Sequence, residues 1–171
     1  LAIGADDAIR IDANPVDAMQ VATLIAEQAR QGAYDVILCG KETIDHNGSV
    51  VGGMLAELID APFISLATSL EVEGNTVKAK REASGGLEHV QAESPVVVSA
   101  SKGMAEQRIP NMRGIMAART KPLNVISAEE LAQSASVAKF ELPPAKGDCK
   151  IVSADEPEEL VRLLREEAKI L

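Results

Sequence analysis

The sequence predicts an α/β fold: a mostly parallel sheet with helices on both faces, a β-hairpin insertion, and an extended C-terminal arm that ends in a helix. Two observations predict this fold, one for the sheet and one for the hairpin. Apolar runs that suit buried strands alternate with segments of helical period, and their order is βαβα. Alternation on both sides of a Gly-Asn turn predicts the hairpin. We therefore divide the chain into an α/β domain at residues 1–132, with the hairpin at about 64–93, and an arm at residues 133–171.

The first half of the chain supplies the alternating strands and helices. Asn14 and Pro15 form a helix start, with Asn14 as the N-cap and Pro15 at the first helical position. The apolar run after Asp35 suits a strand buried on both faces. The predicted elements are a strand at Ala8–Asp12, a helix from Pro15 to Gly32, a strand at Asp35–Cys39, and a helix that carries Met54, Leu55, Leu58 and Ile59 and stops at Asp60–Pro62.

The second half begins with the hairpin and ends with the arm. Ser127 and Glu130 form a capping box that opens a short helix. The stretch Gln133–Lys150 reads as extended, and a segment with so few core residues needs a surface to lie on, either its own domain or a partner. The other predicted elements are strands at Ile64–Glu73, Val77–Arg81, after Gly85–Gly86, at Pro95–Ala100 and at Leu123–Ile126, and helices at about Asn111–Ala118 and Asp155–Leu171.

Composition excludes several classes of function. The net charge of −9 and an aromatic content of 2% argue against nucleic-acid binding, which needs a basic face and stacking rings. Two cysteines and two histidines at unrelated positions indicate no metal site and a reducing compartment. No stretch reaches the ~18 apolar residues of a membrane span, and no signal peptide is present. Because the chain starts without Met, we expect it to lack an N-terminal part.

The stretch CGKETIDHNGSVVGGM, residues 39–54, is the strongest candidate site. It leads from a predicted strand of a parallel sheet to a helix, and ligands bind at such edges. Backbone N–H groups of Gly48–Val51 at the helix start suit a phosphate, and Asp45 suits ribose hydroxyls. The alternative is a solvated loop in which Ser49 is a simple N-cap. The sequence shows no catalytic constellation, and His46 reads as an exposed loop side chain.

The residues also resemble a known family. DVILCGKETIDHNGSVVGGMLAELIDAPFIS resembles the nucleotide-binding loop of the beta (small) subunit of electron-transfer flavoproteins. LEVEGNTVKAKREASGGLEHVQAESPVVVSA is similar to the hairpin and following strand of that family. MRGIMAARTKPLNVISAEEL and ELPPAKGDCKIVSADEPEELVRLL follow in the same order. The resemblance covers essentially the whole chain.

The resemblance implies a subunit of an electron carrier without catalytic residues of its own. In this family an alpha subunit holds most of the FAD, and the beta subunit binds AMP structurally in an adenine-nucleotide-binding α/β domain. Acyl-CoA or related flavin dehydrogenases reduce the FAD, and a membrane quinone oxidoreductase takes the electrons, so fatty-acid oxidation is the implied context. The arm would pack on the alpha subunit. The implied location is the bacterial cytoplasm, or else the mitochondrial matrix.

The resemblance also assigns site residues. The AMP site falls on the end of the strand and the following loop, where many members carry Gln-Thr in place of Val50-Val51, so here backbone donors must suffice. The dehydrogenase-recognition loop corresponds to about Ser101–Asn111. The implied cofactor-binding residues are Gly40, Asp45, Asn47, Gly48, Ser49, Val50 and Val51, and the implied partner-binding residues are Met104, Glu73 and Arg108.

Two other readings remain open. An electron-bifurcating member of the same family would hold a second FAD in the nucleotide site. A universal-stress-type adenine-nucleotide-binding regulator would transfer no electrons, although the long arm and the paired glycines Gly85 and Gly86 argue against it. The number of flavins in the purified complex distinguishes the three.

Overall fold

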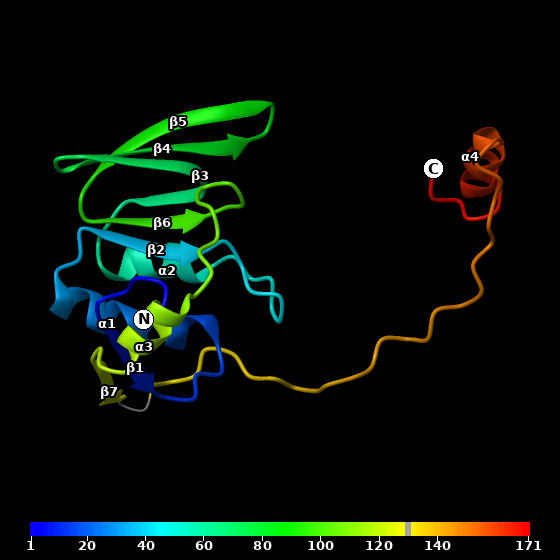
Figure 1. The fold of residues 1–171 in the computed structure, drawn as a ribbon. Helices are drawn as coiled ribbons and strands as arrows, with labels where there is room; N and C mark the ends of the chain where they lie inside the picture. Colours follow the sequence, from blue (N-terminus) through cyan, green and yellow to red (C-terminus); the bar gives the residue numbers. More distant parts are fainter. Residues whose placement is uncertain (129–130) are drawn as a thin grey trace. The chain divides into compact units, whose positions relative to one another are not determined.

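The structure is a computed structural model that describes residues 1–128 and 131–171. The chain divides into two compact units, residues 1–136 and 137–171 (Figure 1). The first unit contains the two sheets and three of the described helices, and the second contains one described helix. The elements are β1 (Ala8–Asp12), α1 (Ala18–Gly32), β2 (Val36–Gly40), α2 (Val51–Leu58), β3 (Phe63–Glu73), β4 (Thr76–Ala83), β5 (Gly86–Glu93), β6 (Val96–Ala100), α3 (Met112–Ala118), β7 (Leu123–Ser127) and α4 (Pro157–Glu166).

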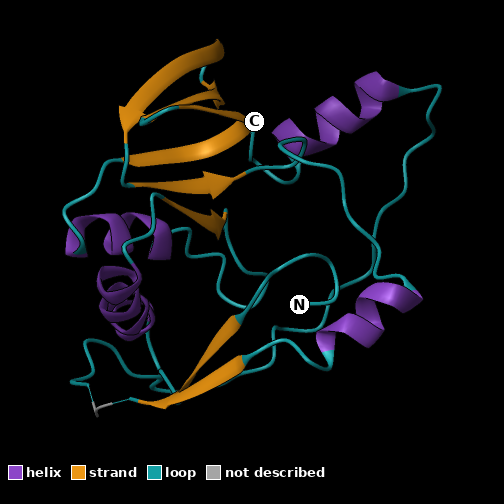
Figure 2. Ribbon diagram, turned by 60° about the vertical axis from the view of Figure 1, so that its left-hand side comes forward, coloured by secondary structure: helices purple, strands orange, loops and turns teal. Residues whose placement is uncertain are grey.

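The first unit has one five-stranded sheet and one two-stranded sheet. The larger sheet has the strand order β2-β6-β3-β4-β5, and the smaller one pairs β1 with β7 (Figure 2). The β2–β6, β3–β6 and β1–β7 pairs are parallel, whereas β3–β4 and β4–β5 are antiparallel. The predicted mostly parallel α/β fold with a hairpin insertion and a final helix is therefore confirmed.

The core is organised around β6, which lies between β2 and β3. Val96, Val97 and Val98 are all fully buried. Val96 and Val98 belong to a cluster with the hairpin residues Val77 and Ala79. Val97 belongs to a second cluster with Leu55 of α2 and Ala26 of α1. Successive side chains of β6 point to opposite faces of the sheet, so Val96 and Val98 pack with hairpin residues and Val97 packs with the helices.

The two helices of this core form one layer. α2 packs against β6, β3 and β2, and α1 packs against α2 (Figure 1). α2 is short because Asp60, in the left-handed region at φ 54°, ends it before Pro62. The predicted stop at Asp60–Pro62 is confirmed.

The predicted start of the first helix is wrong. α1 begins at Ala18 with Asp17 as its N-cap, not at Asn14 and Pro15. The Gln20 N–H donates to Asp17 Oδ1 at 2.8 Å, and the Val16 N–H donates to Gln20 Oε1 at 2.9 Å. Asp17 thus caps the helix, and Gln20 reaches back one residue beyond the cap to Val16, so two backbone N–H groups at the helix start have side-chain acceptors.

The remaining elements agree with the predictions in type and differ at their ends. The hairpin turn carries Gly74 at φ 62°, and Asn111 caps α3 by accepting from the Gly114 N–H at 2.8 Å. α4 is shorter than the predicted helix at Asp155–Leu171. Glu130 of the predicted Ser127 capping box lies outside the described residues, and the chain from Leu131 onward is not helical until α4.

Burial separates side chains that stabilise the fold from those that do not. Leu55→Ala removes a fully buried side chain between α2 and β6, so we expect the free energy of unfolding to fall by about 2–5 kcal/mol. Ile44→Ala is the control: Ile44 is 99% exposed, and the change should stay within about 0.5 kcal/mol. Urea denaturation of both variants measures the difference. Equal effects would contradict this description of the core.

Candidate functional site

The candidate site lies where β2 ends and α2 begins. β2 ends at Gly40, which pairs with Ala100 at the carboxyl end of the parallel β2–β6 pair. The chain then forms a loop, residues 41–50, and α2 starts at Val51. Its N-cap is Val50, and no side chain caps the helix. The sequence placed the helix opening at Gly48 and Ser49, and the structure moves it two to three residues along the chain.

The loop is built on a tight turn and two left-handed residues. The Asn47 N–H donates to the Thr43 carbonyl at 2.7 Å. Asn47 and Ser49 have φ values of 47° and 54°. Such values are uncommon outside glycine, although Asn tolerates them better than most residues. Gly48 lies between these two left-handed residues.

Ser49 does not act as an N-cap. Its hydroxyl donates to Glu42 Oε2 at 3.2 Å, which links the two ends of the loop. Glu42 also lies 3.3 Å from Lys41 Nζ, and Lys41 is the only lysine or arginine in residues 41–50. The simple N-cap reading of Ser49 is therefore wrong. The first N–H groups of α2 are left without a side-chain cap, as an anion would require.

Asp45 is ionised and exposed. The Thr43 hydroxyl, followed by the backbone N–H of Asp45 itself, holds the pKa of this carboxyl below its usual range. The His46 N–H donates to Asp45 Oδ1 at 3.1 Å, and the His46 side chain is 81% exposed. An ionised carboxylate in this position can accept hydrogen bonds from ligand hydroxyls.

Two glycines of this region differ in how much space surrounds them. A Cβ on Gly52 would lie 3.0 Å from the Phe63 ring, so α2 approaches β3 closely there. A Cβ on Gly48 would only reach Val50 Cγ2 at 3.6 Å, which is ordinary contact. Packing explains Gly52, and it leaves Gly48 without a structural requirement.

One exposed side chain of the loop was not singled out by the sequence. Ile44 is 99% exposed, between two polar neighbours. A single isoleucine in a polar loop has no periodicity, so only the structure reveals its exposure. Among the described residues, no group of histidine, cysteine and acidic side chains is arranged to hold a metal ion.

The three predicted partner-binding residues lie outside this loop. Met104 is half-buried and packs against the cluster of Val77 and Val96, so only part of its side chain is accessible to a partner. Glu73, at the end of β3, accepts from Lys78 Nζ at 2.6 Å and so has an ion pair within the hairpin. Arg108 is exposed in the segment before α3.

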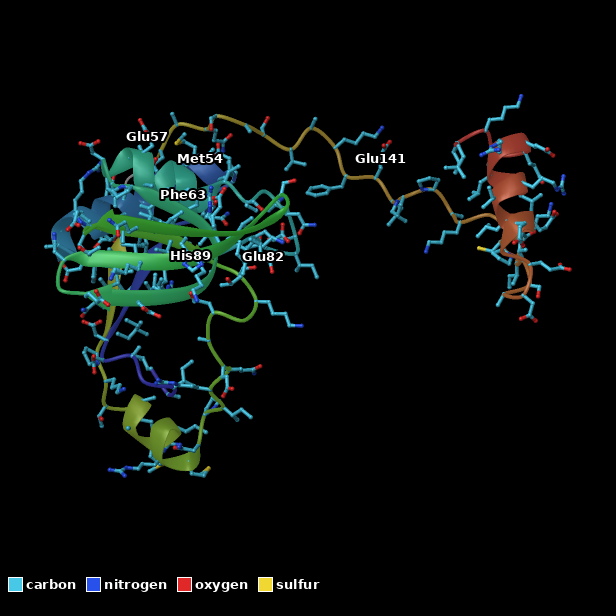
Figure 3. The ribbon with its side chains drawn as sticks, turned by 90° about the horizontal axis from the view of Figure 1, so that it is seen from above. Met54, Glu57, Phe63, Glu82, His89 and Glu141 are labelled. Atoms are coloured by element: carbon cyan, nitrogen blue, oxygen red, sulfur yellow. The ribbon has the colours of Figure 1, made fainter. Side chains whose placement is uncertain are left out.

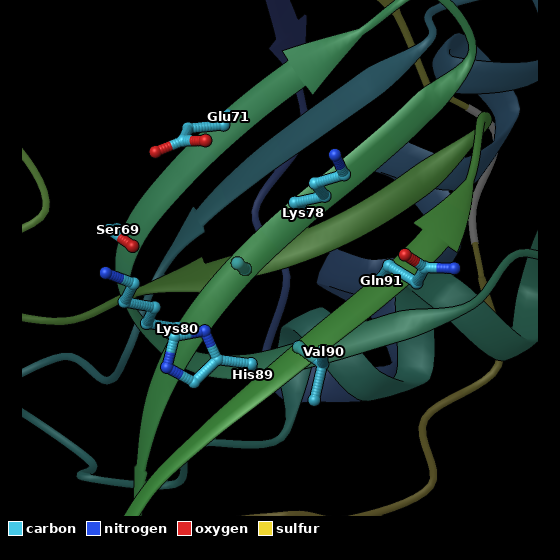
Figure 4. A pocket seen from close by; sticks show the side chains of 8 residues that line it. Ser69, Glu71, Lys78, Lys80, His89, Val90 and Gln91 are labelled. Atoms are coloured by element: carbon cyan, nitrogen blue, oxygen red, sulfur yellow. The ribbon is translucent and has the colours of Figure 1, made fainter.

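The outer face of the hairpin sheet carries a shallow polar cavity of about 290 Å³ (Figure 4). Its lining mixes both charges: Glu71 and Lys78 face one another across β3 and β4, and Lys80 faces His89 across β4 and β5. Lys78 Nζ is in addition paired with Glu73 Oε2, so its charge is compensated within the hairpin.

Comparison with known proteins gives consistent results. Residues 1–131 match the model of the electron transfer flavoprotein domain. The chain is similar to an electron transfer flavoprotein subunit beta from Bacillus subtilis (strain 168), with 33% identity over 186 residues that cover 100% of this chain and 72% of that protein. The corresponding subunit of Sus scrofa is 34% identical over 179 residues, covering 99% and 69%. That of Homo sapiens is 33% identical over the same length and with the same coverage.

Proposed function

The chain belongs to the electron transfer flavoprotein family, and we propose that it serves as the beta subunit of a heterodimeric electron carrier rather than as an enzyme. The observation that carries the proposal is the match to beta subunits over essentially the whole chain. The absence of a catalytic constellation in the sequence agrees with this role. In the proposed complex the FAD is held mostly by an alpha subunit, and this chain stabilises the complex.

We assign the loop at residues 41–50 to the phosphate of a structurally bound AMP. Two features support the assignment of the phosphate: the carboxyl end of a parallel strand pair and the uncapped start of α2. The ionised Asp45 would accept from the ribose hydroxyls of the same ligand. The side chains of Val50 and Val51 carry no hydroxyl or amide group, so backbone N–H groups would hold the phosphate. Gly40, Asn47, Gly48 and Ser49 would line the approach. A second FAD at this place, as in a bifurcating carrier, is the alternative.

The proposed electron donors are acyl-CoA or related flavin dehydrogenases, and the proposed acceptor is a membrane quinone oxidoreductase. Docking is assigned to the segment Ser101–Asn111, with Met104 as an adaptable apolar contact and Arg108 as a charged one. Because Met104 also packs on the hairpin cluster, its truncation is expected to affect stability as well as docking. Among the described residues, no helix is long and apolar enough to cross a membrane. We propose a bacterial cytoplasmic setting, with the mitochondrial matrix as the alternative.

The arm is assigned to the alpha subunit. In the second unit, Phe140, Leu142 and Ile151 are each at least 90% exposed. Residues 137–156 contain no helix or strand, and Glu141 is labelled in this extended segment in Figure 3. Large apolar side chains spaced along an extended segment are the pattern of a peptide that gains its burial from a partner.

The flavin content of the complex tests the proposed function. We expect the complete protein, expressed with its alpha subunit, to purify with one FAD and one AMP, and a cognate dehydrogenase to reduce the flavin. Visible absorption counts the flavin, and chromatography of the denatured complex identifies the nucleotide. Two flavins would support the bifurcating alternative. No flavin would support the universal-stress-type regulator and contradict the proposal.

Gly48→Val tests the assignment of the loop. The structure has room for a side chain at Gly48, so we expect an unchanged melting temperature but loss of most of the bound AMP, because the side chain would occupy the position of the phosphate. Gly86→Val is the control, since a Cβ there meets nothing within 4 Å. Full AMP recovery from the Gly48→Val complex would show that the nucleotide binds elsewhere.

Phe140→Ala tests the assignment of the arm. If Phe140 is buried in the alpha subunit, its truncation should weaken assembly about ten-fold or more. Ile44→Ala, which removes an equally exposed apolar side chain outside the arm, should leave assembly unchanged. Analytical ultracentrifugation over a dilution series measures both. An unchanged dissociation constant for Phe140→Ala would contradict the assignment of the arm to the alpha subunit.

A further inference from the structure

The amino end of α1 holds a distant segment of the chain. Asp17 Oδ2 accepts three hydrogen bonds, from the Ser134 N–H at 2.8 Å, the Ser134 hydroxyl at 2.9 Å and the Ala135 N–H at 3.1 Å. Gln20 Nε2 donates to the carbonyls of Leu131 and Ala132 at 2.9 and 3.3 Å. We call these five hydrogen bonds the clamp. They join residues 17–20 to residues 131–135 across more than 110 positions of sequence.

The clamp includes a buried polar side chain whose hydrogen-bonding groups are all paired. Gln20 is only 7% exposed, and each of its amide atoms is used: Oε1 accepts from Val16 and Nε2 donates to the distant carbonyls. The Gln20 and Ser134 backbone N–H groups lower the pKa of Asp17 to about 2. A carboxylate that accepts several backbone hydrogen bonds remains ionised at any physiological pH. Asp17 is therefore present as the hydrogen-bond acceptor throughout that pH range.

The clamp ends where the arm begins. The last clamped residue is Ala135, and the first compact unit ends at Ser136. Phe140, the most exposed aromatic residue of the arm, follows after five residues. With the clamp closed, an extended chain of that length reaches about 18 Å at most from Ala135. With the clamp open, the nearest fixed strand end is Ser127, and thirteen residues reach about 45 Å.

We propose that Asp17 and Gln20 are positioning residues that hold the root of the C-terminal arm and so confine its apolar side chains for capture by the partner subunit. The proposal rests on the assignment of the arm to the alpha subunit. Effective concentration falls roughly as the −3/2 power of tether length, so opening the clamp should lower it about four-fold. A second estimate compares the spherical volumes that Phe140 can reach at about 18 Å and at about 45 Å. Their ratio corresponds to an effective concentration about fifteen-fold lower with the clamp open. Association should slow within that range.

Asp17→Asn separates the clamp from the helix cap. Oδ1 of asparagine still accepts from the Gln20 N–H, so α1 keeps its cap, while an amide NH₂ replaces the Oδ2 that accepts from Ser134 and Ala135. Gln20→Glu is the second variant: it keeps an acceptor for Val16 and loses the donor to Leu131 and Ala132. Asp7→Asn is the control for Asp17→Asn, because it removes one negative charge in the same way at an exposed residue outside the clamp.

The experiment uses the complete protein and its alpha subunit and has two readouts. Hydrogen exchange of the free subunit should show faster exchange at residues 131–135 in both clamp variants, with unchanged protection in β6. Stopped-flow mixing with the alpha subunit should show association about four- to fifteen-fold slower in both variants and unchanged in Asp7→Asn. A purely structural role would lower the melting temperature without this selective change in association rate.

Each contrary result has a separate meaning. Unchanged exchange at residues 131–135 would show that the clamp does not hold the arm root, and the proposal would be wrong. Faster exchange with wild-type association would show that the root is held but that holding it does not serve capture, which also overturns the proposal. If Phe140→Ala assembles normally, the assignment of the arm fails first, and with it the positioning role. The exchange result then still decides whether the clamp exists.

Discussion

Burial of β6 on both faces is the constraint on which the rest of the domain depends. Three consecutive valines leave no face of this strand for solvent, so one side must be covered by the hairpin and the other by α2. A strand that is apolar on both faces suits the interior of a sheet and no other position. β2 and β3 consequently flank β6 in parallel, and the helix between them must cross the same face.

That arrangement positions the proposed nucleotide site. Because β2 runs parallel to β6, its carboxyl end and the start of α2 meet at one edge of the sheet. α2 approaches β3 closely at Gly52, where a side chain would meet the Phe63 ring. The loop between them is therefore held at both ends while its middle remains exposed. Packing requirements end at Gly52, and the residues before it are available for function.

The sequence predicted the elements whose information is local. β1, the hairpin and the buried strand were recognised because periodicity and turn residues act within a few positions. The start of α1 was misplaced although a local signal was available, Asp17 followed by Gln20 at the third position. The three further hydrogen bonds that hold Asp17, from Ser134 and Ala135, come from a distant segment and leave no local pattern. The half-burial of Met104 was missed for the same reason, since its contacts come from the hairpin.

The division of the chain at the clamp also has an evolutionary consequence. The family match ends at residue 131, and the clamp begins with the carbonyl of Leu131. Beyond Ser136 most of the large apolar side chains are exposed, and none belongs to the buried core clusters of the first unit. Under the proposed assignment of the arm to an alpha subunit, selection on the arm acts through the surface that receives it, whereas selection on the domain acts through the domain's own fold. The two parts of one polypeptide would then diverge at different rates, the arm in step with its proposed partner.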